Sequence, residues 1–136
     1  MKVVKVIGGI LGLLAVVVIL MPSAPTPVSV SKATFEQVDQ ATGCQSKNSS
    51  DKKEHLFDTQ FKNHQLTWSG VVVTAGDGNV SIDTNGAGTQ DLRVSLKDKQ
   101  QAVELQKGQK ITVQFTMNNI GGCVLPYSGS DAIVMN

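Results

Sequence analysis

The chain has 136 residues, of which 40% are hydrophobic, 17% charged and only 4% aromatic, and its formal net charge at pH 7 is +1. Once the two lysines near the N-terminus are set aside, acidic side chains outnumber basic ones by one. This balance lacks the basic footprint of a general nucleic-acid-binding protein, and the length supports a single small hydrophobic core.

The N-terminus has the pattern of an export signal or a membrane anchor. Lys2 and Lys5 precede an apolar run, Val6 to Met21, and no further charge follows until Lys32. As a helix this run would span about 24 Å, whereas the hydrocarbon core of a bilayer is roughly 30 Å thick. The run is short for a membrane span and long for a cleaved signal, so residues 1–21 are interpreted as a signal anchor or a signal peptide.

The residues after this run favour the uncleaved anchor. Cleavage after Ala24 would place Pro22 and Pro25 at unfavourable positions. Ser31 and Ala33 have the preferred small side chains, but they lie far from the apolar run. Because the lysines precede the run, we expect the N-terminus in the cytoplasm and the domain in the periplasm, on a single-pass protein of the inner membrane. Cleavage would instead give a periplasmic or secreted domain.

A proline-rich linker, residues 22–33, is expected before a folded domain over residues 34–136. The first predicted helix begins at Thr34, which has a capping-box spacing with Gln37, and ends at Gly43. A second short helix follows a polar loop. Asp51 and Glu54 give it a capping-box spacing of its own, and Phe57 and Phe61 share one face.

From Gln65 onward the hydrophobic pattern has a period of two, which predicts β-strands. Asp77-Gly78 fits a hairpin turn between the first two strands, and a short helix ending before Gly108 is predicted between the third and the fourth. The last strand is expected to be broken by a turn at residues 127–131. The predicted segments are strands 65–75, 79–83, 91–96 and 110–117, helix 102–105, and strand pieces 124–125 and 132–134.

Five strands with a helix between the third and the fourth strand are typical of an OB-fold barrel. The predicted fold is therefore a mainly β domain, preceded by one or two short helices and by the N-terminal hydrophobic helix. Gly70, in the first strand, suits the sharp coiling that such a barrel needs.

Three segments carry a family resemblance: "TWSGVVV", "AVELQKGQKITVQF" and "GGCVLPYSGSDAIV". They resemble the bacterial tRNA-anti-like OB-fold proteins, which are small exported domains. The resemblance covers residues 34–136 and its motifs are mostly structural. It implies an OB fold and a location in the cell envelope, and it transfers no catalytic residue.

Cys44 and Cys123 are the only cysteines. An even number of cysteines in a small exported domain predicts a disulfide, which would tie the N-terminal helical segment to the closing strand. Gly121 and Gly122 would let the backbone approach closely there. The alternatives are a nucleophilic Cys123 and a metal site built from the two cysteines and two histidines, but His55 and His64 lie on polar segments and no closely spaced ligand pair exists.

An OB barrel usually binds ligands across its second and third strands. Arg93 is the only cation expected there, and no aromatic platform accompanies it. Trp68 is expected in the core, and Tyr127, in the last turn, is the other candidate contact residue. The oxygen-rich segment 77–86 lacks the spacing of a calcium loop and is interpreted as turn chemistry. The outward residues are expected to be Ser81, Asp83, Arg93 and Ser95.

These observations predict a membrane-anchored binding or interaction module of the cell envelope, without catalytic activity or cofactor. Its expected partners are the membrane, through the N-terminal helix, and an envelope protein or glycan. The alternative is an oligonucleotide or oligosaccharide binder that uses the face of strands two and three. The near-neutral charge argues against nucleic acid.

Overall fold

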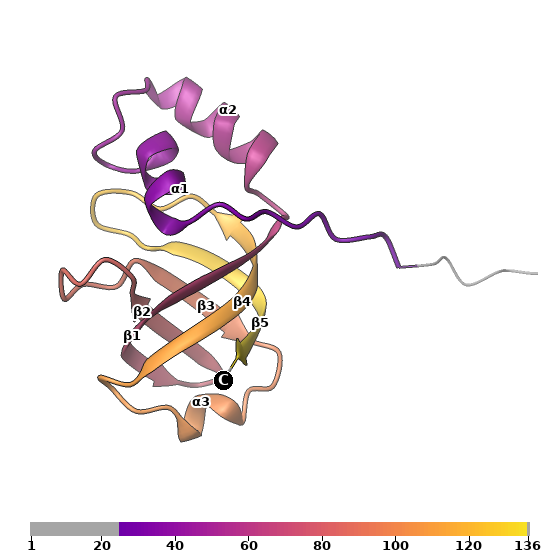
Figure 1. Cartoon of the computed structure of the whole chain (residues 1–136), viewed down its shortest axis with the longest axis vertical. Helices are drawn as coiled ribbons and strands as arrows, with labels where there is room; N and C mark the ends of the chain where they lie inside the picture. The colour runs from indigo at the N-terminus through magenta and orange to yellow at the C-terminus, as the bar shows by residue number, and fades with distance from the viewer. Residues whose placement is uncertain (1–24, 136) are drawn as a thin grey trace, which may run out of the picture.

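The structure, a computed structural model, describes residues 25–135. Five strands form a closed barrel in the order β1-β2-β3-β5-β4, with α1 and α2 at one end and α3 at the other (Figure 1). The predicted mainly β barrel, with a short helix between its third and fourth strands, is therefore confirmed. The elements are α1 (Phe35–Thr42), α2 (Ser50–Gln60), β1 (Gln65–Gly76), β2 (Asn79–Asp83), β3 (Leu92–Leu96), α3 (Gln101–Glu104), β4 (Lys110–Asn119) and β5 (Tyr127–Met135).

The long strand β1 closes the barrel because it pairs with two neighbours. Its first half is antiparallel to β4, and its second half, from Val71 onward, is antiparallel to β2, with a register shift between Val72 and Thr74. Strands β3 and β5 pair in parallel, and β4 with β5 completes the ring. The turn between β1 and β2 is the predicted one, since Asp77 and Gly78 have positive φ values of 51° and 74°.

Gly70 lies where β1 passes very close to another strand. A Cβ atom at this position would overlap the backbone carbonyl of Asp83, so only glycine fits where the two strands meet. Gly129 in β5 plays a similar part, because a Cβ there would lie 2.6 Å from a ring carbon of Phe115.

The core follows the predicted alternation most clearly in β4, where Ile111, Val113, Phe115 and Met117 are all buried. At the helical end of the barrel the core is aromatic. The ring of Trp68 packs edge-to-face against Phe35 of α1, Phe115 of β4 and Tyr127 of β5, at centroid distances of 5.4, 5.2 and 5.9 Å. This cluster attaches α1 to the barrel.

Both helices predicted before the barrel are present, and their N-terminal caps differ from each other. Thr34 and Gln37 form the predicted capping box of α1. The cap of α2 is Ser49, whose hydroxyl accepts a hydrogen bond from the N–H of Lys52. The predicted capping box at Asp51 is therefore wrong. Asp51 lies in the first turn of α2, where its negative charge interacts favourably with the positive end of the helix dipole.

The last strand differs from its prediction. Residues 127–131 are part of a continuous β5 instead of a turn, while Val124 and Leu125 belong to the preceding loop. The serines and glycine of this stretch pair with β3 on one side and with β4 on the other, and this pairing outweighs their weak strand propensity. In α3, Val103 is exposed and Ala102 is the buried residue.

The predicted N-terminal hydrophobic helix lies outside the described residues. Within residues 25–135 no helix is both long enough and apolar enough to cross a membrane.

The end of the proline-rich linker is bound to the barrel. The N–H of Ser31 donates to the carbonyl of Gln65 at 2.9 Å, and the N–H of Gln65 donates to the carbonyl of Ser29 at 2.8 Å. The indole N–H of Trp68 donates to the carbonyl of Ala33 at 3.0 Å. From Ser29 onward, therefore, the chain has a fixed path along the start of β1.

Candidate functional site

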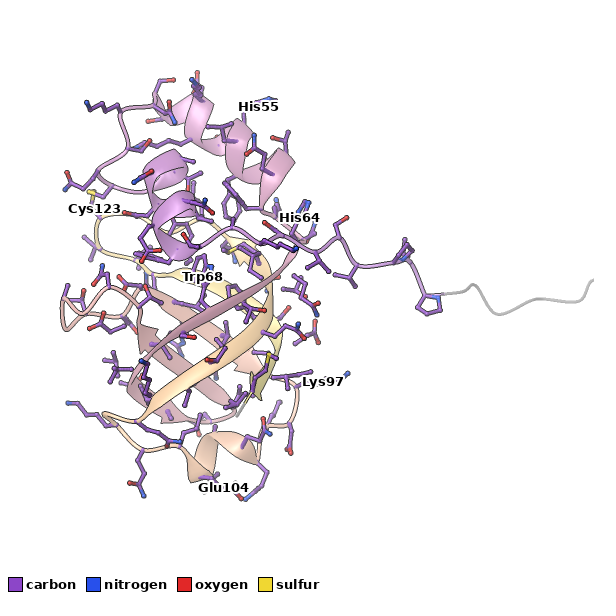
Figure 2. All side chains as sticks on the ribbon, in the orientation of Figure 1. His55, His64, Trp68, Lys97, Glu104 and Cys123 are labelled. Atoms are coloured by element: carbon purple, nitrogen blue, oxygen red, sulfur yellow. A yellow bond between two sulfur atoms is a disulfide. The ribbon has the colours of Figure 1, made fainter. Side chains whose placement is uncertain are left out.

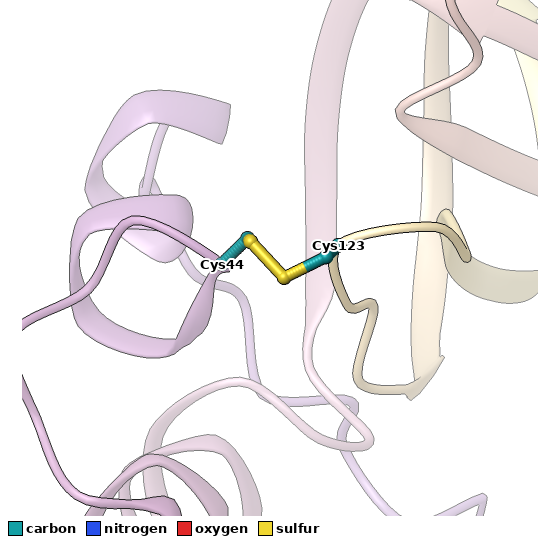
Figure 3. Close-up of a disulfide and its surroundings, with 2 residues drawn as sticks. All are labelled: Cys44 and Cys123. Carbon is teal, nitrogen blue, oxygen red and sulfur yellow. A yellow bond between two sulfur atoms is a disulfide. The ribbon is translucent and has the colours of Figure 1, made fainter.

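A disulfide joins Cys44, just after α1, to Cys123, in the loop between β4 and β5 (Figure 3). The predicted pairing is confirmed, with the two Cα atoms 4.8 Å apart. Cys123 lies in the loop before the closing strand, so the bond fixes this loop, residues 120–126, against the helical end of the barrel. Both cysteines are exposed.

The two glycines before Cys123 have different roles. A Cβ atom at Gly121 would lie 2.9 Å from the backbone nitrogen of Tyr127, so the predicted close approach of the backbone occurs at this residue. Gly122 has open space around it, and its N–H donates to the carbonyl of Leu125 at 2.8 Å. This hydrogen bond and the disulfide set the shape of loop 120–126.

Two clefts adjoin the disulfide, and both are lined by Gly122 and Cys123. The first, which we call the α2 cleft, has a volume of about 630 Å³ and lies between α2 and the start of loop 120–126. The second, the loop cleft, has a volume of about 540 Å³ and lies between α1, residues 89–91 and loop 120–126.

One wall of the loop cleft belongs to loop 84–91, which is organised by the carboxylate of Asp83. This carboxylate accepts hydrogen bonds from the N–H groups of Asn85, Gly86 and Gly88 at 3.1, 2.7 and 2.7 Å. Asp83 is thus buried instead of facing outward as predicted. Its carboxylate stabilises the turn that follows it, as expected for an aspartate in such a segment. Burial favours the neutral acid, but the backbone N–H groups outweigh it, so the pKa of Asp83 is lower than usual.

We expect Asp83→Asn to destabilise the domain by about 1 to 2 kcal/mol, because one carboxylate oxygen that accepts backbone N–H groups is replaced by an amide NH2. Since folding lowers the pKa of Asp83, the carboxylate stabilises the fold above its usual pKa, and this contribution is lost as the pH falls through the lowered value. Urea denaturation at neutral and acidic pH measures both effects. Asp77→Asn, in the exposed hairpin turn, is the matched control and should cost little.

The electrostatic character of the loop cleft comes from Asp39 of α1 and Asp91 of loop 84–91. None of its lining residues is Lys, Arg or His. Asp91 accepts hydrogen bonds from Thr84 and Asn85, whereas the carboxylate of Asp39 has no hydrogen bond or ion pair among the described residues. Burial, and then the charge of Asp91, raise the pKa of Asp39, and Lys53 partly opposes them.

Tyr127 lies at the edge of this cleft, with most of its ring in the core. Its hydroxyl is 2.8 Å from the hydroxyl of Thr42. The predicted position in an exposed turn is therefore wrong, because only 4% of Tyr127 is exposed. Burial raises the pKa of Tyr127 to about 12; the charge of Asp39 adds to this effect and the hydrogen bond with Thr42 opposes it.

A spectroscopic titration should show this shift directly, since Tyr127 is the only tyrosine of the chain. We expect the tyrosinate absorbance of the folded protein to rise near pH 12, and that of the unfolded protein to rise near the usual value of about 10. Because folding raises the pKa, this group stabilises the fold fully below the unfolded pKa and loses that contribution as the pH rises through the folded one. Absorbance that rises at the unfolded value before the circular dichroism changes would contradict the burial.

The face of strands β2 and β3 is only partly as predicted. Arg93 and Ser95 are exposed, whereas Ser81, which pairs with Thr74 of β1 and Arg93 of β3, is buried. Arg93 and Tyr127 are not brought together: Arg93 faces outward and Tyr127 inward.

The histidines do not form a site with the cysteines. His55 lies on α2 and His64 precedes β1, both away from Cys123, whose sulfur is in the disulfide (Figure 2). Trp68, predicted in the core, is 3% exposed.

Sequence reasoning missed the site that the fold builds at this end. The sequence pattern predicts a strand at Val124 and Leu125, although the flanking Cys123 and Pro126 indicate a constrained loop. Asp39 lies on an ordinary amphipathic helix, and only the fold brings it beside Asp91.

Comparison of the chain with protein-family models, curated proteins and solved structures finds no match. Its functional interpretation therefore depends on its own residues and their geometry.

Proposed function

We propose that the chain is an exported OB-fold domain that binds another envelope component without catalysis, and that the loop cleft and its rim form the binding surface. The strand order, the parallel pairing of β3 with β5 and the position of α3 support the OB fold. The resemblance to tRNA-anti-like proteins agrees with this fold.

The observation that carries the proposal is the exposure of loop 120–126. Val124 is 90% exposed and Leu125 is 72% exposed, side by side on a loop that the disulfide fixes. Single exposed apolar residues are common, but adjacent ones beside a cleft are typical of an interaction surface. A fixed loop also loses little conformational entropy when a partner binds.

An envelope location is supported by two features of the chain. The first is the basic and then apolar N-terminal sequence, which favours membrane anchoring with the domain in the periplasm. The second is the exposed disulfide, since such bonds persist in oxidising compartments.

Site-specific photo-crosslinking in living cells tests the proposal. A photoreactive amino acid would replace Val124 in the full chain and, as the matched control, Val103, which is 72% exposed on α3 at the opposite end of the barrel (Figure 1). A discrete crosslinked product at Val124 that is absent at Val103 is expected. Equal products at both positions, or none at Val124, would overturn the proposal.

The second candidate function, binding of an anionic oligosaccharide or oligonucleotide to the β2–β3 face, is favoured by the exposure of Arg93 beside Ser95. It requires that Arg93→Ala abolish binding without changing stability, that salt weaken binding, and that Lys97→Ala, an exposed control, have no effect.

A further inference from the structure

The loop cleft differs from the α2 cleft in its charge. The α2 cleft is lined by Lys53 and Lys62 together with Glu54 and Asp58, so its charges balance, and Lys62 lies 3.5 Å from Asp58. The loop cleft is lined by two carboxylates and by no cationic side chain. The negative charge and the apolar rim of the loop cleft together indicate which chemical groups an occupant would carry.

Within the loop cleft the two carboxylates are not equivalent. The carboxylate of Asp91 accepts four hydrogen bonds from Thr84 and Asn85. Its role in shaping loop 84–91 therefore explains why an acidic residue is present at this position. The carboxylate of Asp39 makes no such contact among the described residues, although the side chain is only partly exposed and shares the cleft with Asp91. Apart from Lys53, whose charge acts on Asp39 without lining the cleft, no described cation offsets this charge, and a cation placed in the cleft would complement both carboxylates.

The apolar part of the site adjoins this charge. Val124 and Leu125 line the same cleft as Asp39, and Val73 of β1 contributes further apolar surface. Loop 120–126 is fixed by the disulfide and by the bond from the N–H of Gly122 to the carbonyl of Leu125, and the N–H of Tyr127 donates to the carbonyl of Asp91. These bonds join the apolar rim to the acidic wall, so the two parts of the site are presented together.

We propose that the loop cleft binds a polypeptide segment in which a lysine or arginine stands next to a large apolar side chain. The cation would lie between Asp39 and Asp91, and the apolar side chain would cover Val124 and Leu125. This inference rests on the proposed function and names the class of partner. A phospholipid with an amine head group combines a cation with apolar chains, but its phosphate would be repelled by the two carboxylates.

Four short capped peptides of equal length test the proposal, with isothermal calorimetry on the full chain. The first carries one arginine between two leucines. In the others citrulline or glutamate replaces the arginine, or glycine replaces both leucines. We expect the first peptide to bind most tightly, to bind more weakly in high salt, and to lose roughly fivefold or more in affinity with Asp39→Asn. Glu54→Gln, in the α2 cleft, is the matched control and should bind like the natural chain.

The results separate this inference from the proposed function. If Val124 crosslinks to a partner but the citrulline or glutamate peptide binds as well as the arginine peptide, or no peptide binds, the cationic assignment is overturned while the binding surface stands. Binding to vesicles of amine phospholipids that does not change in Asp39→Asn would assign the surface to lipid. Dimerisation of the chain that Asp39→Asn abolishes would assign it to a second copy. Either result overturns the proposal, and thermal unfolding of Asp39→Asn verifies that the fold is retained.

Discussion

Loss of the Cys44–Cys123 disulfide should lower the free energy of unfolding by up to about 4 to 5 kcal/mol, because the bond closes a long loop and so restricts the unfolded chain. The two cysteines are separated by 79 residues. A domain of this size has a total stability of about 5 to 15 kcal/mol, so the loss would be a large share of it. Urea denaturation of the natural chain and of the Cys44→Ser, Cys123→Ser double variant measures the difference.

The reductant provides the control for this comparison. A thiol reductant should destabilise the natural chain to about the level of the double variant and leave the double variant unchanged. Intact mass with and without reductant shows that the bond was present, since its reduction adds two hydrogen atoms. If the oxidised chain and the double variant unfold at the same urea concentration, the bond does not stabilise the domain through its unfolded state.

Trp68→Ala should be the most damaging single substitution in the core, with a loss of about 3 to 5 kcal/mol. It removes the ring that packs against Phe35, Phe115 and Tyr127, and it removes the indole N–H that donates to the carbonyl of Ala33. Because Phe35 belongs to α1, the helix should loosen from the barrel as well. Trp68→Phe keeps an aromatic ring and should cost less.

Circular dichroism is the suitable measurement for these variants, because Trp68 is the only tryptophan and its fluorescence disappears with the substitution. Val103→Ala is the control, since its side chain is 72% exposed; it should change stability by no more than about 0.5 kcal/mol. Equal stability of Trp68→Ala and the natural chain would contradict the packing described for the aromatic cluster.

Much of the barrel could be predicted because its strands alternate strictly. Every second residue of β4 is apolar and buried, and the turn at Asp77-Gly78 needs the positive φ values that these residues tolerate. The disulfide could be predicted because the chain has two cysteines and an N-terminal pattern that predicts export. These features are local, or they follow from composition.

The remaining features depend on contacts between distant segments. β5 carries serines and glycine that resemble a turn, and it becomes a strand because two neighbours supply its hydrogen-bond partners. Asp83 occupies an outward position by alternation, yet loop 84–91 folds over its carboxylate. The candidate site escaped prediction for the same reason, since Asp39 and Leu125 meet only when α1 and loop 120–126 are placed at one end of the barrel.

The disulfide also determines how the domain would respond to a mechanical pull on its two ends. The covalent ring closed by Cys44 and Cys123 contains α2 and the strands β1 to β4, whereas α1 and β5 lie outside it. A stretched chain of 79 residues would reach roughly 270 Å, and this length cannot add to the extension of the protein while the disulfide is intact. Under force, β5 and α1 can be peeled away, and the rest of the barrel can lengthen only after reduction.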